Sequence, residues 1–136
     1  MDFFEVSETD YPKIAKDILE FSHKHLIWTF VGNLGAGKTT LIKSLAKAMN
    51  IDDKVQSPTF SLVNQYGQKI YHFDCYRLNS LNEALDFGME EYLESNKYCW
   101  IEWPEKIESI LPKPYVEIKI EYGKNLTRNI SLQIKD

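Results

Sequence analysis

The chain has 136 residues, of which 43% are hydrophobic and 26% are charged, as in an ordinary globular protein. This length suffices for one hydrophobic core but not for two, so we expect a single domain over residues 1–136. The net charge of −4 argues against a protein that holds DNA or RNA by itself, because such domains carry a surplus of basic residues.

Targeting and cysteine patterns indicate a cytoplasmic protein. No apolar run approaches the roughly 20 residues that span a bilayer, so no membrane association is expected. The N-terminus, beginning Met1-Asp2-Phe3, has no basic stretch followed by an apolar one, which argues against a secretory signal. Cys75 and Cys99 lack the spacing of a metal site, so we interpret them as reduced thiols inside strands.

The first half of the chain alternates between helix and strand patterns. A helix is expected from Thr9, because Pro12 suits a first turn and apolar residues recur from Ile14 at helical spacing. Residues 26–31 form a nearly continuous apolar run, typical of a strand buried on both faces in a parallel sheet. A glycine-rich turn follows, and then an amphipathic helix that ends near Asn50.

The second half contains two predicted hairpins. One consists of residues 60–66 and 69–76 around Gly67. Ser80-Leu-Asn-Glu83 is a capping box, so a helix should follow toward Leu93, weakened at Gly88.

An apolar strand is expected over residues 98–103. The other hairpin, residues 115–122 and 128–135, should have one solvated face because its apolar and polar residues alternate. The predicted fold is α/β, a mixed and mostly parallel sheet flanked by helices, with antiparallel hairpins.

The segment Gly32-Asn-Leu-Gly-Ala-Gly37-Lys38-Thr39 fits the pattern G-x-x-x-x-G-K-[ST] between a buried strand and an amphipathic helix. Glycines let backbone N–H groups wrap a triphosphate, and the helix N-terminus favours negative charge. Lys38 should reach the β- and γ-phosphates, and the Thr39 hydroxyl should ligate Mg²⁺. The residues expected to bind ATP are Gly32, Asn33, Leu34, Gly35, Ala36, Gly37, Lys38, Thr39 and Thr40.

Such a loop needs an acid at the end of a neighbouring strand, and two candidates exist. Asp74 ends the run Ile70-Tyr-His-Phe-Asp, and Glu102 ends Tyr98-Cys-Trp-Ile-Glu. We expect one acid to hold magnesium and the other to orient the attacking water or sense the γ-phosphate. The pattern does not decide which acid has which role, and either could instead pair with a surface lysine.

Three further residues have alternative interpretations. Thr59 could contact the γ-phosphate as a switch residue, or lie in a turn that Pro58 starts. Trp103 could belong to the core, clamp a base or face a partner. His72 is interpreted as a packed strand residue, because no second His or Cys stands at metal-ligand spacing.

These motifs, taken in order, resemble the bacterial TsaE (YjeE) family of small ATPases over nearly the whole chain. The resemblance rests on residues 32–40, Val55-Gln-Ser-Pro-Thr-Phe60, 62–66, His72-Phe-Asp-Cys-Tyr-Arg77, 88–93 and Ile101-Glu-Trp-Pro-Glu105. One departure is Cys75, which stands where leucine is usual in the family.

The resemblance implies a P-loop fold, hydrolysis of Mg-ATP and a role in threonylcarbamoyladenosine modification of tRNAs that read codons beginning with A. It implies that TsaD and TsaB are the partners, that TsaD carries the transferase chemistry, and that tRNA is contacted only through that complex. It assigns Lys38 and Thr39 to phosphate and Mg²⁺, and Thr59 to the switch. Asp74, Glu102 and Trp103 are carried over as active-site residues, and the adenine site loosely as residues 6–9.

Two other functions compete with this interpretation. A small-molecule P-loop kinase would need an arginine-rich lid, but Arg77 and Arg128 are the only arginines. A non-catalytic adaptor would use ATP binding alone to drive assembly, which the two strand-end acids disfavour.

Overall fold

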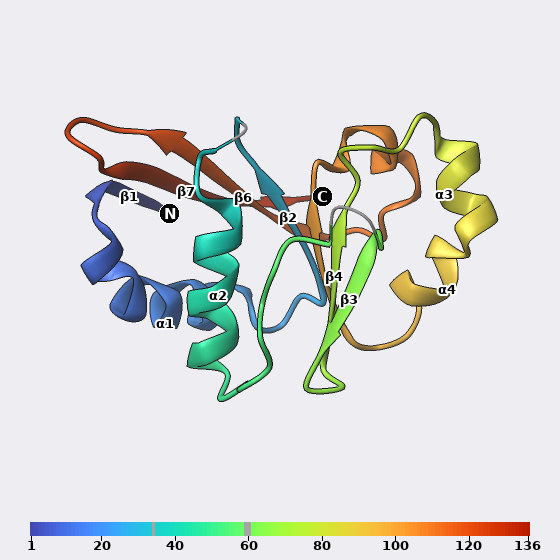
Figure 1. Ribbon diagram of the computed structural model, residues 1–136, viewed down its shortest axis with the longest axis horizontal. Helices are drawn as coiled ribbons and strands as arrows, with labels where there is room; N and C mark the ends of the chain where they lie inside the picture. Colours follow the sequence, from blue (N-terminus) through green and yellow to red (C-terminus); the bar gives the residue numbers. More distant parts are fainter. Residues whose placement is uncertain (34, 59–60) are drawn as a thin grey trace.

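In a computed structural model, which describes residues 1–33, 35–58 and 61–136, the chain forms one mixed sheet with helices on both faces (Figure 1). The strands in the described residues are β1 (Asp2–Val6), β2 (Ile27–Val31), β3 (Val63–Tyr66), β4 (Ile70–Asp74), β5 (Tyr98–Glu102), β6 (Tyr115–Tyr122) and β7 (Arg128–Lys135). The α-helices are α1 (Tyr11–Ser22), α2 (Lys38–Ala48), α3 (Leu81–Phe87) and α4 (Met89–Leu93). Short 3₁₀ turns occupy Glu8–Asp10, Pro104–Lys106 and Glu108–Ile110.

The strand order is β1-β7-β6-β2-β5-β4-β3. The central strands β6, β2, β5 and β4 pair in parallel, while β1, β7 and β3 add antiparallel pairings toward the edges. The α/β prediction with a parallel centre and antiparallel hairpins is therefore confirmed. β2 lies between two parallel neighbours, and its residues 27–30 are buried, as the apolar run predicts.

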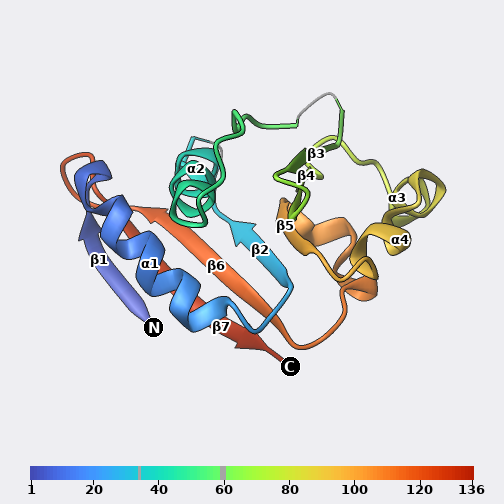
Figure 2. The same ribbon diagram turned by 90° about the horizontal axis from the view of Figure 1, so that it is seen from below.

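Two apolar layers cover opposite faces of the sheet. Figure 2 shows the helices over them, α1 and α2 on one side and α3 and α4 on the other. Helices α1 and α2 pack on one face against a cluster that includes Trp28, Trp100 and Ile118. Helices α3 and α4 pack on the other face against Phe73 and Ile101, among others. Because side chains alternate along a strand, β5 can supply Trp100 to one layer and Ile101 to the next.

The predicted elements match the observed ones apart from their ends and one strand. Strand β1 was not predicted, because its five residues do not alternate clearly and its partner β7 lies at the other end of the chain. The helix predicted up to Leu93 is broken at Gly88, where the left-handed φ of 92° ends α3 and begins α4. The β6–β7 hairpin has the expected solvated face, on which Lys119 and Glu121 are exposed.

Both cysteines are free and buried, Cys99 in β5 and Cys75 just after β4. Burial raises the pKa of each thiol from 9.0 to about 12, which leaves roughly a thousandth of the usual thiolate. We therefore expect native protein to react with a thiol reagent at pH 8 about a thousandfold more slowly than unfolded protein. Labelling followed by mass spectrometry, with and without denaturant, measures this ratio, and equal rates would contradict it.

No helix in the described residues is long and apolar enough to cross a membrane.

Candidate functional site

The glycine-rich loop, residues 32–37, leaves the carboxyl end of β2 and enters α2. Gly37 stands at the N-cap of α2 with a left-handed φ of 95°, which a glycine adopts without steric cost. A Cβ at Gly32 would lie 2.5 Å from the Ile120 carbonyl oxygen, so the backbone passes too close to β6 for any other residue. The Ala36 N–H donates to the Asn33 carbonyl oxygen within the loop, and the N-terminus of α2 lies at the carboxyl end of the parallel strands.

The C-terminal hairpin, β6 and β7, contacts this loop through Arg128. The Nε atom of Arg128 donates a hydrogen bond to the Ala36 carbonyl oxygen at 2.9 Å, and its guanidinium lies 4.5 Å from the centre of the Tyr122 ring. The sequence does not predict this contact, because Arg128 lies 92 positions beyond Ala36. No local pattern marks an arginine that will face a distant carbonyl group.

Lys38, the first residue of α2, is only 6% exposed. Its ammonium donates to the Gly32 carbonyl oxygen at 2.6 Å and lies 3.7 Å from the centre of the Trp103 ring. Burial lowers the pKa of Lys38, while the negative charges of Glu102 and Asp74 oppose this shift. The charge is therefore held in a poorly hydrated position, where an anion would interact with it strongly.

The two acids predicted at strand ends lie next to each other. β4 and β5 are parallel, and their register pairs Asp74 with Glu102 at the carboxyl ends of both strands. Asp74 is 7% exposed, and its carboxylate accepts hydrogen bonds from the Ser57 hydroxyl at 2.8 Å and the Tyr76 backbone N–H at 3.0 Å. Glu102 is 3% exposed, and its Oε2 lies 2.6 Å from Nε2 of His72.

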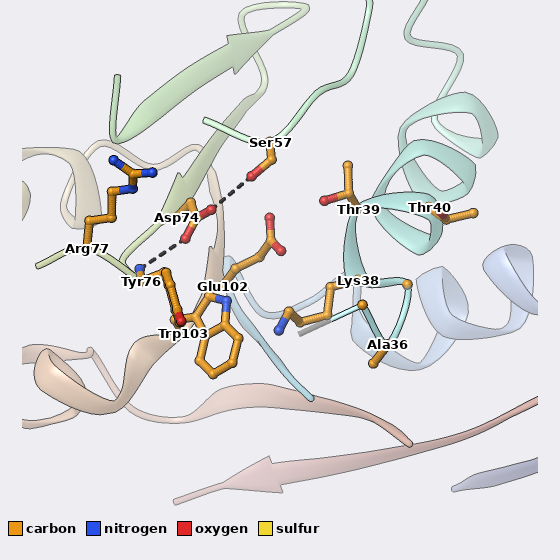
Figure 3. Close-up of a pocket in the computed structure, with 12 residues that line it drawn as sticks. Ala36, Lys38, Thr39, Thr40, Ser57, Asp74, Tyr76, Arg77, Glu102 and Trp103 are labelled. Carbon is orange, nitrogen blue, oxygen red and sulfur yellow. Dashed lines mark hydrogen bonds between the residues drawn. The ribbon is translucent and has the colours of Figure 1, made fainter. Parts of the chain in front are cut away.

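These groups surround one cavity of about 530 Å³ (Figure 3). Its lining consists of Gly35, Ala36, Gly37, Lys38, Thr39, Thr40, Ser57, Asp74, Tyr76, Arg77, Glu102 and Trp103. In Figure 3 Lys38 and Trp103 point toward each other, and the Glu102 carboxylate lies between Lys38 and the Asp74–Ser57 pair. Nine of the residues predicted for the site therefore share this cavity.

Two predicted residues, Gly32 and Asn33, stand elsewhere. Gly32 and Asn33 line a second cavity of about 290 Å³, on which Trp103 also borders. Leu34 and Thr59 lie outside the described residues, so their predicted roles stay predictions. Tyr76 and Arg77 line the main cavity without having been predicted as site residues. Ser57, two positions before the predicted switch residue Thr59, lines it as well. Their positions in the sequence, close to Pro58 or Asp74, could have indicated them, because loops at strand ends often carry functional residues.

Similarity to known proteins now decides the family. Residues 6–130 match the family model described as threonylcarbamoyl adenosine biosynthesis protein TsaE. The chain belongs to the TsaE family. It is 38% identical over 124 residues to the tRNA threonylcarbamoyladenosine biosynthesis protein TsaE of Haemophilus influenzae, covering 88% of this chain and 78% of that protein. The protein of the same name from Bacillus subtilis is 34% identical over 129 residues, covering 93% and 80%.

The fold agrees with a solved structure. The crystal structure of Bacillus subtilis YdiB matches with a TM-score of 0.80 and 28% identity, over 100% of this chain and 86% of that one. The TsaE family and its fold, both expected from the order of the motifs, are therefore confirmed.

The donor atoms of this TsaE-family site suit magnesium held together with a nucleotide. The described residues contain no group of three or more His, Cys, Asp or Glu side chains that could hold a metal alone. Magnesium is usually bound by one or two carboxylates together with substrate phosphates. Asp74, Glu102 and the Thr39 hydroxyl offer such a partial set at the cavity, and Figure 3 shows Thr39 facing the two acids.

Trp103 should report nucleotide binding through Lys38. Its backbone has a left-handed φ of 55°, uncommon for a bulky residue, and places the indole over the ammonium. A triphosphate would draw Lys38 away from the ring, so we expect tryptophan emission to change on addition of Mg-ATP. Trp28 and Trp100 are buried and stacked on each other 5.1 Å apart, so they supply a constant background. A Trp103→Phe variant that keeps the full response would contradict this assignment.

Proposed function

We propose that this chain binds and hydrolyses Mg-ATP in the cavity between the glycine-rich loop and the acids Asp74 and Glu102. Within tRNA threonylcarbamoyladenosine biosynthesis, we propose that this cycle serves a TsaB–TsaD transferase complex. The observation that carries the proposal is the single cavity in which a buried lysine, a helix N-terminus and two buried carboxylates meet.

Each side chain has a role that follows from its charge and position. The backbone N–H groups of Gly35 and Gly37 and the ammonium of Lys38 would hold the phosphates, and Lys38 would neutralise charge on the transferring group. Magnesium, held by Thr39 and one carboxylate together with phosphate oxygens, would add Lewis-acid stabilisation of the same charge. The other carboxylate would orient the attacking water, for which the burial of both acids is suitable.

The proposed partners are inferred from the net charge of this protein and from the pathway named for its relatives. The net charge of −4 offers little attraction for tRNA, so we propose that the tRNA is held by the transferase complex and not by this chain. Hydrolysis would then be slow in the isolated protein and faster with its partners.

A phosphate-release assay tests the proposal. Purified protein is incubated with labelled ATP, alone and with TsaB and TsaD, and free phosphate is followed. Release that the partners stimulate is expected. Transfer of the label to a small acceptor would instead indicate a kinase. Nucleotide-dependent assembly without release would indicate an adaptor.

Nucleotide-dependent partner binding tests the switch. A ligand can shift a conformational equilibrium only through contacts that differ between the two conformations. The γ-phosphate is the group that distinguishes ATP from ADP. We therefore expect tighter association with TsaB–TsaD in ATP than in ADP, and a smaller difference for Thr59→Ala. Equal affinities in ATP, in ADP and without nucleotide, measured by surface plasmon resonance, would remove the switch from the mechanism.

A further inference from the structure

Behind Glu102, a chain of polar contacts crosses three neighbouring strands. Nε2 of His72 in β4 lies 2.6 Å from Oε2 of Glu102 in β5, and Nδ1 of His72 lies 2.8 Å from the Tyr66 hydroxyl in β3. The Tyr66 hydroxyl also lies 3.0 Å from the Gln56 carbonyl oxygen, so its single proton is shared between hydrogen-bonding positions toward that oxygen and toward Nδ1. We call Glu102, His72, Tyr66 and the Gln56 carbonyl group the buried polar chain.

The buried polar chain lies inside the apolar layer under α2. His72 is fully buried and Tyr66 is 2% exposed. Tyr66 packs in the same cluster as Ile70 and Trp100, which flank His72 along β4 and across β5. An imidazole costs free energy in such surroundings unless its nitrogens are hydrogen-bonded, and here both have a partner. An apolar side chain would fill the space without that requirement.

The two ends of the buried polar chain meet the candidate site at different places. At one end Glu102 lines the cavity. At the other end Gln56 directly precedes Ser57, whose hydroxyl donates to Asp74. The backbone at residues 56–57 is thus linked to Asp74 through Ser57 and to Glu102 through Tyr66 and His72.

The buried polar chain also determines the orientation of the Glu102 carboxylate. A carboxylate only accepts hydrogen bonds, so the Nε2 proton of His72 holds Oε2. Among the described residues no group bonds Oε1, which remains available to a metal ion or water at the cavity. A glutamate has three rotatable bonds, and a buried contact of this kind selects one orientation from several.

We propose that His72 and Tyr66 are positioning residues that orient the Glu102 carboxylate and couple it to the segment Gln56–Ser57. This inference rests on the proposed ATPase function. A shift of residues 56–57 on nucleotide binding would be transmitted through Tyr66 and His72 to Glu102, so both acids would respond to one segment.

Three variants test the positioning role by the turnover of ATP in the presence of partners. Tyr66→Phe removes one hydroxyl, and should lower kcat about five- to tenfold at unchanged KM, the value of one buried hydrogen bond. His72→Leu removes the whole link, and should lower kcat about a hundredfold. His72→Gln can still donate to Glu102, and should recover most of that loss.

Tyr71→Phe is the matched control. Tyr71 precedes His72 in β4 but faces the opposite layer, where its ring packs against Tyr92 and Phe73. Its hydroxyl makes no hydrogen bond to the described residues, so its loss should leave kcat unchanged. Wild-type kcat in folded Tyr66→Phe and His72→Leu would overturn the inference. If His72→Leu does not fold, Tyr66→Phe and His72→Gln decide.

A spectroscopic measurement separates this inference from the proposed function. The Nε2 proton of His72 should give a downfield nitrogen-bound resonance that Glu102→Gln shifts. A non-hydrolysable ATP analogue with Mg²⁺ should move this resonance in the wild type, and less in Tyr66→Phe. A resonance indifferent to the analogue would overturn the coupling even if ATP is hydrolysed. A resonance that responds to the analogue in a protein that releases no phosphate would support the coupling and contradict the proposed ATP hydrolysis.

Discussion

Replacing Lys38 with alanine should lower ATP turnover about a hundred- to a thousandfold, the effect of removing one preorganised charge from a developing anion. The fold should survive, because Lys38 is the first residue of α2, where alanine is a good helix former. Among the described residues, its ammonium contacts the Gly32 carbonyl oxygen and the Trp103 ring and makes no ion pair. Phosphate release measures turnover, and circular dichroism measures folding.

Lys43→Ala is the control for this substitution. Lys43 lies in the same helix with the same charge but is exposed and outside the cavity. Its replacement should leave both turnover and nucleotide affinity within about twofold, because an isolated surface charge contributes little. A folded Lys38→Ala protein with wild-type turnover would remove the glycine-rich loop from the proposed function.

Glu102→Gln should lower turnover about a hundredfold or more, since the neutral amide cannot replace a carboxylate beside a metal or an attacking water. Glutamine is preferable to alanine here. Alanine would leave the buried Nε2 of His72 without a partner and cost about 1–3 kcal/mol of stability. The glutamine oxygen still accepts this hydrogen bond, so the melting temperature should change little.

Asp74→Asn should also lower turnover, and the pair of variants can resolve the roles of the two acids. The variant of the direct magnesium ligand should need a higher Mg²⁺ concentration for half-maximal turnover. The other should show the wild-type Mg²⁺ dependence at a lower maximum. Glu90→Gln, on the exposed surface of α4, is the control for loss of one carboxylate. Wild-type turnover in either Glu102→Gln or Asp74→Asn would contradict the proposed site.

Tertiary contacts alter the interpretation of one residue in particular. His72 was interpreted as a packed strand residue, and it is indeed buried in β4. Its ring nitrogens nevertheless contact Tyr66 and Glu102, so it belongs to the surroundings of the site. Its burial could be inferred from the apolar residues around it, but its partners could not, because Glu102 is 30 residues away in the chain.

Periodicity and spacing alone determined the elements that hold the site. The apolar run of β2, the glycines and the stripe of α2 are local patterns, since backbone conformation and burial follow from neighbouring residues. The acids at the ends of β4 and β5 were located in the same way. Their adjacency was not, because parallel strands meet only when the sheet order β2-β5-β4 is set by the packing of two apolar layers. The same packing decided that Arg128 supports the loop, that β1 joins β7 and that Lys38 lies under Trp103. Each of these contacts joins residues far apart in the chain, and its partners are determined by the geometry of the assembled sheet.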